Sequence, residues 1–186
     1  MAIHQYKVYL IPRKSIVEKY HEIPKQLFID HEGWEKHWEK ESDEDIYDFE
    51  DALTTKWWTE RKILFNQVEP LIVKFSKQIA WTKNSISSKS YGNSETNDLS
   101  IDITEDNFIE HFNFRFDLRK FDQKFMDKIF SIAKLIDCVF LDRKGNLFEP
   151  NFELFTENSK KSSAFLFVNN PTEYLYQLST GLFKHE

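Results

Sequence analysis

The sequence predicts an α+β fold in which amphipathic helices pack over one face of a mainly antiparallel meander sheet. The sheet is predicted by apolar residues that alternate with polar ones at a period of two, most clearly over 108–119. The helices are predicted by apolar residues that recur every three or four positions over 46–79 and 122–136. The length of 186 residues, with 18 Phe, indicates a single domain with a sizeable core over 1–186.

The chain opens with a strand and a short helix. The predicted strand over 5–11 places Tyr6, Val8 and Leu10 on one side and Lys7, Tyr9 and Ile11 on the other, which indicates that both faces are mostly buried. Pro12 ends this strand because proline has no amide hydrogen to donate to a neighbouring strand. A short helix is expected over 15–21, before Pro24.

The segment from Asp30 to Trp58 is acidic and rich in tryptophan, and we expect residues 30–79 to form a helical, acidic part of the domain. Residues 30–51 hold eleven acidic residues and two lysines, and 30–58 holds four of the five Trp. A capping box at Ser42 and Asp45 predicts a helix start, followed by apolar positions at Ile46, Phe49, Leu53 and Trp57. The helical rhythm continues to Ile79, with a break expected at Pro70.

Residues 81–150 are predicted to form a sheet-plus-helix part. Strands are expected over 81–91, 99–104 and 108–119, joined by a turn over 92–97 and a tight connection over 105–107. Asp122 caps a helix that runs to Ile136 and crosses to a strand over 138–141, a turn over 142–146 and a short return strand over 147–148. Near the end, Asn170, Pro171 and Gly181 mark a terminal helix.

The phenylalanine face of the 108–119 strand requires a cover. At roughly 25 cal/mol per Å² of apolar surface, leaving it in water would cost several kcal/mol, which is comparable with the stability of a whole domain. We therefore expect the predicted helices over 46–79 and 122–136 to lie on this face.

Composition excludes several functional classes. Four isolated glycines cannot build a nucleotide-binding loop, and we expect no cofactor. The single cysteine, Cys138, lies in an apolar stretch and is predicted to be a buried core residue. The pI of about 5.6 argues against nucleic-acid binding. No stretch approaches the roughly 18 apolar residues of a membrane span, so a soluble, cytoplasmic protein is the expectation.

Two patterns suggest a metal site only superficially. His31 and Glu32 begin like the zinc helix H-E-x-x-H, but Glu35 stands at the fifth position, and Gly33 argues against a rigid helix there. Consecutive acids at Asp43–Asp45 lack the alternation and the central glycine of a calcium loop. We therefore predict no metal ion and no catalytic residue.

The polar face of the 108–119 strand is one candidate site. His111, Arg115, Asp117 and Arg119 could line a pocket in an enzyme or a protein that binds small anions. Neighbours on one strand face lie about 7 Å apart, so these side chains need an adjacent strand to form a catalytic pair. Ion pairs between Asp117 and its flanking arginines are the simpler interpretation.

The acidic aromatic segment is the stronger candidate. Carboxylates attract a cationic partner, and exposed tryptophans anchor protein interfaces. The residues predicted to bind such a partner are Trp34, Glu35, Trp38, Glu39, Asp48 and Asp51. In size, acidity and lack of catalytic residues the chain resembles small bacterial immunity proteins, which implies a basic toxin as partner. The expected function is a non-enzymatic protein-binding module, and self-association through the tryptophans is an alternative.

Overall fold

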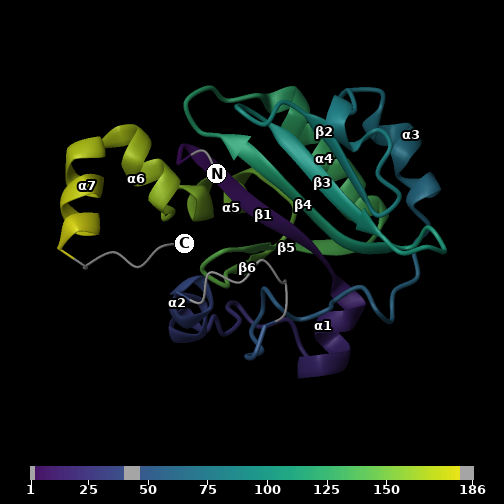
Figure 1. The fold of residues 1–186 in the computed structure, drawn as a ribbon, viewed down its shortest axis with the longest axis horizontal. Coiled ribbons are helices and arrows are strands. Elements are labelled where there is room, and N and C mark those ends of the chain that lie inside the picture. The colour runs from purple at the N-terminus through teal and green to yellow at the C-terminus, as the bar shows by residue number, and fades with distance from the viewer. Residues whose placement is uncertain (1–2, 40–46, 181–186) are drawn as a thin grey trace.

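The computed structural model describes residues 3–39 and 47–180. They form a six-stranded sheet of order β2-β3-β4-β1-β5-β6, in which every neighbouring pair is antiparallel (Figure 1). The predicted α+β fold is therefore confirmed. The strands are β1 Gln5–Pro12, β2 Ser88–Gly92, β3 Asp98–Ile103, β4 Ile109–Asp117, β5 Cys138–Asp142 and β6 Leu147–Phe148.

The strand order confirms the predicted meander and crossing helix. β2, β3 and β4 form consecutive hairpins, and β5 and β6 form the returning hairpin. The chain passes from β4 to β5 through helix α4 (Gln123–Leu135), which carries it across β1 in the middle of the sheet. The first strand is thus central, with β4 on one edge and β5 on the other.

Helices cover the phenylalanine face of the sheet. Phe112, Phe114 and Phe116 of β4 are all 0% exposed. The Phe114 ring contacts Phe125 of α4 and Phe155 of α5 (Phe152–Ser159), with centroid distances of 6.4 and 6.2 Å. Figure 1 shows both helices behind the sheet. The cover predicted over 122–136 is confirmed, whereas α5 was not predicted.

The long helix predicted over 46–79 is wrong. Residues 47–64 form turns, and short helices follow: η1 (Phe65–Gln67), α3 (Glu69–Ile72) and, after residue 79, η2 (Ala80–Thr82). Asp51 and Thr54 accept backbone hydrogen bonds that a helix would otherwise use. Pro70 lies in the first turn of α3, where its missing amide hydrogen costs little. The expected start at Ser42, Asp45 and Ile46 lies outside the described residues.

The acidic segment instead forms a helix earlier, α2 (His31–Glu39). The Asp30 carboxylate accepts a hydrogen bond from the Gly33 amide at 2.9 Å and so caps the first turn. The expectation that Gly33 disfavours a helix here is wrong, because the cap and buried packing outweigh the low propensity of one glycine.

Most other boundaries follow the sequence. α1 spans Arg13–Tyr20, and the Asp122 cap of α4 accepts from the Phe125 amide at 3.0 Å. The strand predicted over 81–91 begins only at Ser88. Two helices close the described chain, α6 (Ser163–Asn169), which was not predicted, and α7 (Pro171–Ser179), which Asn170 caps as expected. The predicted stop at Gly181 lies outside the described residues.

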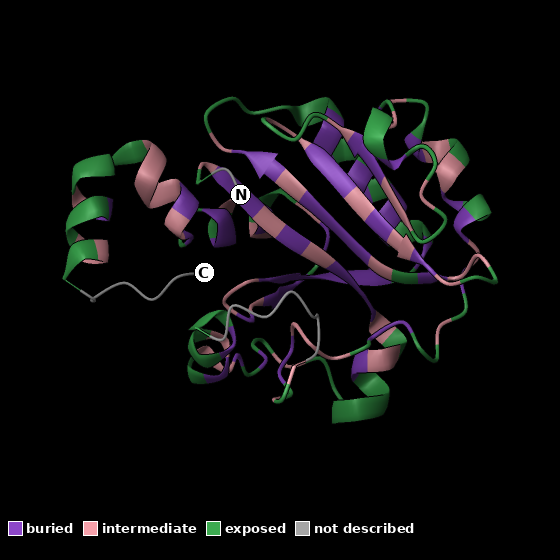
Figure 2. Cartoon of the chain, in the orientation of Figure 1, coloured by how far each residue is buried: buried purple, intermediate pink, exposed green. Residues whose placement is uncertain are grey.

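The second face of the sheet is covered only in part. Trp58 is buried there and donates from its indole nitrogen to the Leu10 carbonyl at 3.1 Å, so the 52–58 segment lies over β1 and β5. Over β2, β3 and β4 this face carries polar side chains. Figure 2 shows the resulting pattern, in which buried and half-buried positions alternate along the strands.

Candidate functional site

The α2 helix organises an aromatic cluster, which consists of Trp34, His37, Trp38, Tyr47 and Phe49. The Trp34 and Trp38 rings stack with a centroid distance of 6.0 Å, as their four-residue spacing predicts. Trp34 also meets the edges of Tyr47 at 5.1 Å and Phe49 at 5.3 Å. The cluster thus connects the helix to the chain that returns after residue 46.

Asp51 fixes this cluster in place. Its Oδ2 atom accepts hydrogen bonds from the Trp34 indole nitrogen at 2.7 Å and from the Asp30 amide at 3.1 Å. Its Oδ1 atom accepts from the amides of Leu53 at 2.7 Å and Thr54 at 3.0 Å. The prediction that Asp51 faces a partner is wrong, because the side chain is buried and its oxygens bind groups of the chain itself.

The outer side of the cluster is exposed. Trp38 is 68% exposed, although its ring rests on Trp34. Glu35 and Glu39 on the same helix are exposed, and so is Asp48 in the chain that follows residue 46. We call Trp34, Glu35, Trp38, Glu39 and Asp48 the acidic aromatic surface. It retains five of the six residues that the sequence predicted for partner binding.

This surface combines a rigid apolar platform with negative charge. An exposed indole face attracts cations, and an Arg or Lys above it also finds carboxylates to pair with. Because Trp38 is supported by Trp34, which is itself anchored by Asp51, little side-chain freedom would be lost on binding. The arrangement could therefore hold a basic side chain between the Trp38 ring and a carboxylate.

The polar sheet face is arranged differently. The His111 Nδ1 atom lies 3.5 Å from an oxygen of Asp102 on the adjacent strand β3, and its ring meets the Tyr9 ring at 5.4 Å. Burial lowers the pKa of His111, Lys7 lowers it further, and Asp102 opposes both. His111 thus contacts a carboxylate across strands, and its Nδ1 atom also lies 3.3 Å from the Asn113 side-chain nitrogen on the same strand.

The arginines of this face are engaged by carboxylates. Arg115 forms a bidentate pair with Asp98, and Arg119 binds Asp117 with a shortest distance of 2.9 Å. Burial tends to raise the pKa of Asp117, but hydrogen bonds from Arg119 outweigh it and lower the pKa. The expected pairing of Asp117 with Arg119 is confirmed, whereas Arg115 pairs with a neighbouring strand.

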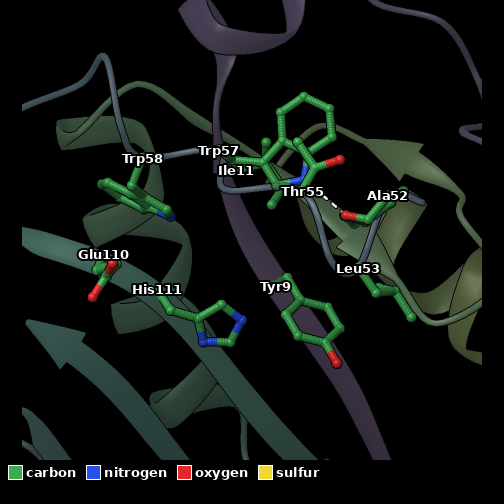
Figure 3. Close-up of a pocket in the computed structure, with 10 residues that line it drawn as sticks. Tyr9, Ile11, Ala52, Leu53, Thr55, Trp57, Trp58, Glu110 and His111 are labelled. Carbon is green, nitrogen blue, oxygen red and sulfur yellow. Dashed lines mark hydrogen bonds between the residues drawn. The ribbon is translucent and has the colours of Figure 1, made fainter. Parts of the chain in front are cut away.

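The cavity that His111 borders does not include the other three residues of this face. His111 borders a cavity of about 10 Å³ between the sheet and the 52–58 segment, which is room for about one water molecule. Figure 3 shows His111 and Tyr9 beneath Trp57 and Trp58 in this cavity. Its lining residues do not include Arg115, Asp117 or Arg119.

Other candidate chemistry is limited in the described part of the chain. Cys138 is 1% exposed, and burial raises the pKa of its thiol, as expected for a core residue. No group of three or more metal-ligating side chains occurs within 3–39 and 47–180. None of the helices in these ranges has the length and apolar character that crossing a membrane requires.

Comparisons with protein-family models, curated proteins and solved structures gave no significant match. Sequence reasoning missed the anchoring role of Asp51 and the histidine in the cluster, His37. The sequence signal for the role of Asp51 is the D-x-x-T pattern that it forms with Thr54. This pattern is typical of an aspartate whose side chain accepts hydrogen bonds from the backbone amides that follow it.

Proposed function

We propose that this protein is a non-enzymatic binding module that engages a basic protein partner through the acidic aromatic surface. The observation that carries the proposal is the 68% exposure of Trp38 on the α2 helix, which also carries the exposed residues Glu35 and Glu39. The contact of a large aromatic ring with water is unfavourable, so burial of the ring in an interface contributes favourable free energy to binding.

Charge supports the same partner chemistry. Residues 30–51 hold a net charge of −9, compared with −6 for the whole chain, so the negative charge is concentrated in this segment. A concentrated field accelerates association with a cationic protein and weakens with salt. An immunity-type inhibitor of a basic toxin in the cytoplasm is the specific form of this proposal, and the resemblance in composition supports it.

The test uses two surface variants and two matched controls. Partners captured from the producing cells by the wild-type chain are compared with those captured by Trp38→Ala and by Glu35→Lys/Glu39→Lys. Trp81→Ala is the aromatic control, because Trp81 is 75% exposed outside the cluster. A double reversal to Lys in the β3–β4 connection, at Glu105 and Asp106, is the charge control.

Binding rates measured on the captured partner give the decision. Trp38→Ala should weaken affinity about 10-fold or more through faster dissociation. The double reversal of Glu35 and Glu39 should lower the association rate about 10-fold or more at low salt, with a smaller effect at high salt. The proposal fails if these variants bind like the two controls.

A further inference from the structure

A groove of about 590 Å³ lies between the start of α4 and the chain that follows α3. Small-molecule sites usually have volumes of about 300–1,000 Å³, so the groove is large enough for a ligand. Figure 1 shows α4 behind the sheet and α3 beside it. Residues 47–180 are described without a gap, so both walls of the groove are described. The lining residues are Lys74, Phe75, Asp122, Lys124, Phe125, Asp127 and Lys128.

Two phenylalanine rings form the apolar part of the groove. Phe125 of α4 is buried, whereas Phe75 is only half-buried. The two rings meet edge to face, with a centroid distance of 5.9 Å and an interplanar angle of 73°. Phe125 also contacts Phe114 of β4, which joins the pair to the core. A half-buried ring that the core holds in place offers a preformed surface on which a planar ligand can stack.

Three lysines add positive charge to this apolar surface. Lys124 and Lys128 lie four positions apart, which places them on one face of α4, and Lys74 comes from the other wall. All three are exposed, and no described residue forms an ion pair with any of them. Three cations around one groove repel one another, so an anion bound among them is stabilised by all three.

Two aspartates also line the groove, and one of them is engaged by the chain itself. Asp122 is the N-cap of α4, where its Oδ1 atom accepts a hydrogen bond from the Phe125 amide at 3.0 Å. The positive end of the helix dipole offsets the charge of this carboxylate. Even with both aspartates counted, the lining has a formal charge of 3 − 2 = +1, in a chain of net charge −6. The groove therefore favours an anion over a cation.

We propose that this groove binds a small aromatic phosphate monoester. The aromatic part stacks on Phe75, and the phosphate binds the ammonium groups of the three lysines. A phosphate monoester carries a charge of about −1.5 to −2 at pH 7, which several cations can share better than the single charge of a carboxylate. Lysine binds phosphate as a point charge, so the site needs no rigid fork geometry. Figure 1 shows α3 and α2 on opposite sides of the molecule, so this ligand leaves the acidic aromatic surface free.

Phenyl phosphate is the probe, and calorimetry and two-dimensional NMR of the full chain at low salt measure its binding. We expect a dissociation constant below about 1 mM. The amide signals that shift should be those of residues in and beside 74–75 and 122–128. Inorganic phosphate lacks the ring and benzyl alcohol lacks the charge, so each should bind about 10-fold or more weakly.

Two variants and one matched control test the lining. Lys124→Gln/Lys128→Gln should weaken the binding of phenyl phosphate about 10-fold or more, because two of the three cations are lost. Lys25→Gln/Lys160→Gln is the control, since both lysines are exposed outside the groove, and it should bind like the wild type. Phe75→Leu keeps an apolar side chain without the ring and should weaken binding about 3-fold or more. Circular dichroism confirms that each variant is folded.

Four results would overturn the proposal. They are the absence of saturable phenyl phosphate binding, amide shifts that lie outside the groove, inorganic phosphate that binds as tightly as phenyl phosphate, and an unchanged dissociation constant in the double lysine variant. Trp38→Ala separates this site from the proposed function, because it should weaken partner binding and leave the binding of phenyl phosphate unchanged.

Discussion

Replacing Asp51 tests how the acidic aromatic surface is held. The carboxylate accepts four hydrogen bonds, two on each oxygen, at 2.7 to 3.1 Å. Hydrogen bonds to charged groups each contribute about 1.5–3 kcal/mol, and a buried donor left without a partner costs about 1–3 kcal/mol. Without the carboxylate, the amides of Leu53 and Thr54 can form hydrogen bonds with water. We therefore expect Asp51→Ala to lower the free energy of unfolding by about 3–5 kcal/mol, which is less than the sum of the four bonds.

Asp51→Asn separates charge from shape. The amide keeps one acceptor oxygen and presents hydrogens to the other two donors, so half of the bonds are lost and the expected cost is about 2–3 kcal/mol. Trp34→Phe removes one of these bonds and part of the packed ring, and it should cost about 1.5–3 kcal/mol. Urea unfolding followed by tryptophan fluorescence and by circular dichroism gives these values. A loss below about 1 kcal/mol for Asp51→Ala would refute the role of Asp51 as the anchor.

Three further predictions concern the sheet and its turns. Gly145→Ala should destabilise the chain by about 1–3 kcal/mol in thermal unfolding, because Gly145 has a φ of 83° and an added Cβ would lie 2.2 Å from the Leu27 carbonyl oxygen. Phe114→Ala should cost about 3–5 kcal/mol in urea unfolding, since it empties a fully buried site, and a cost under 1 kcal/mol would contradict the packing described. Burial lowers the pKa of His111, so the stability it contributes is complete above the unfolded pKa of about 6.5 and is lost as pH falls through the folded value. His111→Gln should weaken the dependence of the free energy of unfolding on pH between about pH 7.5 and 5. An unchanged dependence would contradict this role of His111.

The sheet could be predicted from sequence because its signals are local. In β4 the alternation of Phe112, Phe114 and Phe116 with polar residues fixes both the strand and its buried face. The caps at Asp122 and Asn170 were also readable, because an N-cap depends on residues within one turn. Cys138 was placed in the core for the same reason, through its apolar neighbours.

The segment over 47–64 shows where the prediction from helical periodicity was wrong. Phe49, Leu53 and Trp57 have helical spacing, but Trp57 and Trp58 are buried without a helix around them. Their indole nitrogens donate to the carbonyls of Ala52 and Leu10, and the latter bond joins residues that are 48 positions apart. No local pattern reports such a long-range bond, so helical spacing alone gave the wrong element.

The candidate site divides in the same way. The sequence by itself determined that Trp34 and Trp38 share a helix face and that acidic residues surround them, because both depend on neighbours a few positions apart. Only the tertiary structure decided that Trp38 is exposed and that Asp51 is buried. The physical reason is that burial depends on which distant segments meet. Asp51 turned inward because the donors of Asp30 and Trp34 lie beside it in the folded chain, 21 and 17 positions away in the sequence.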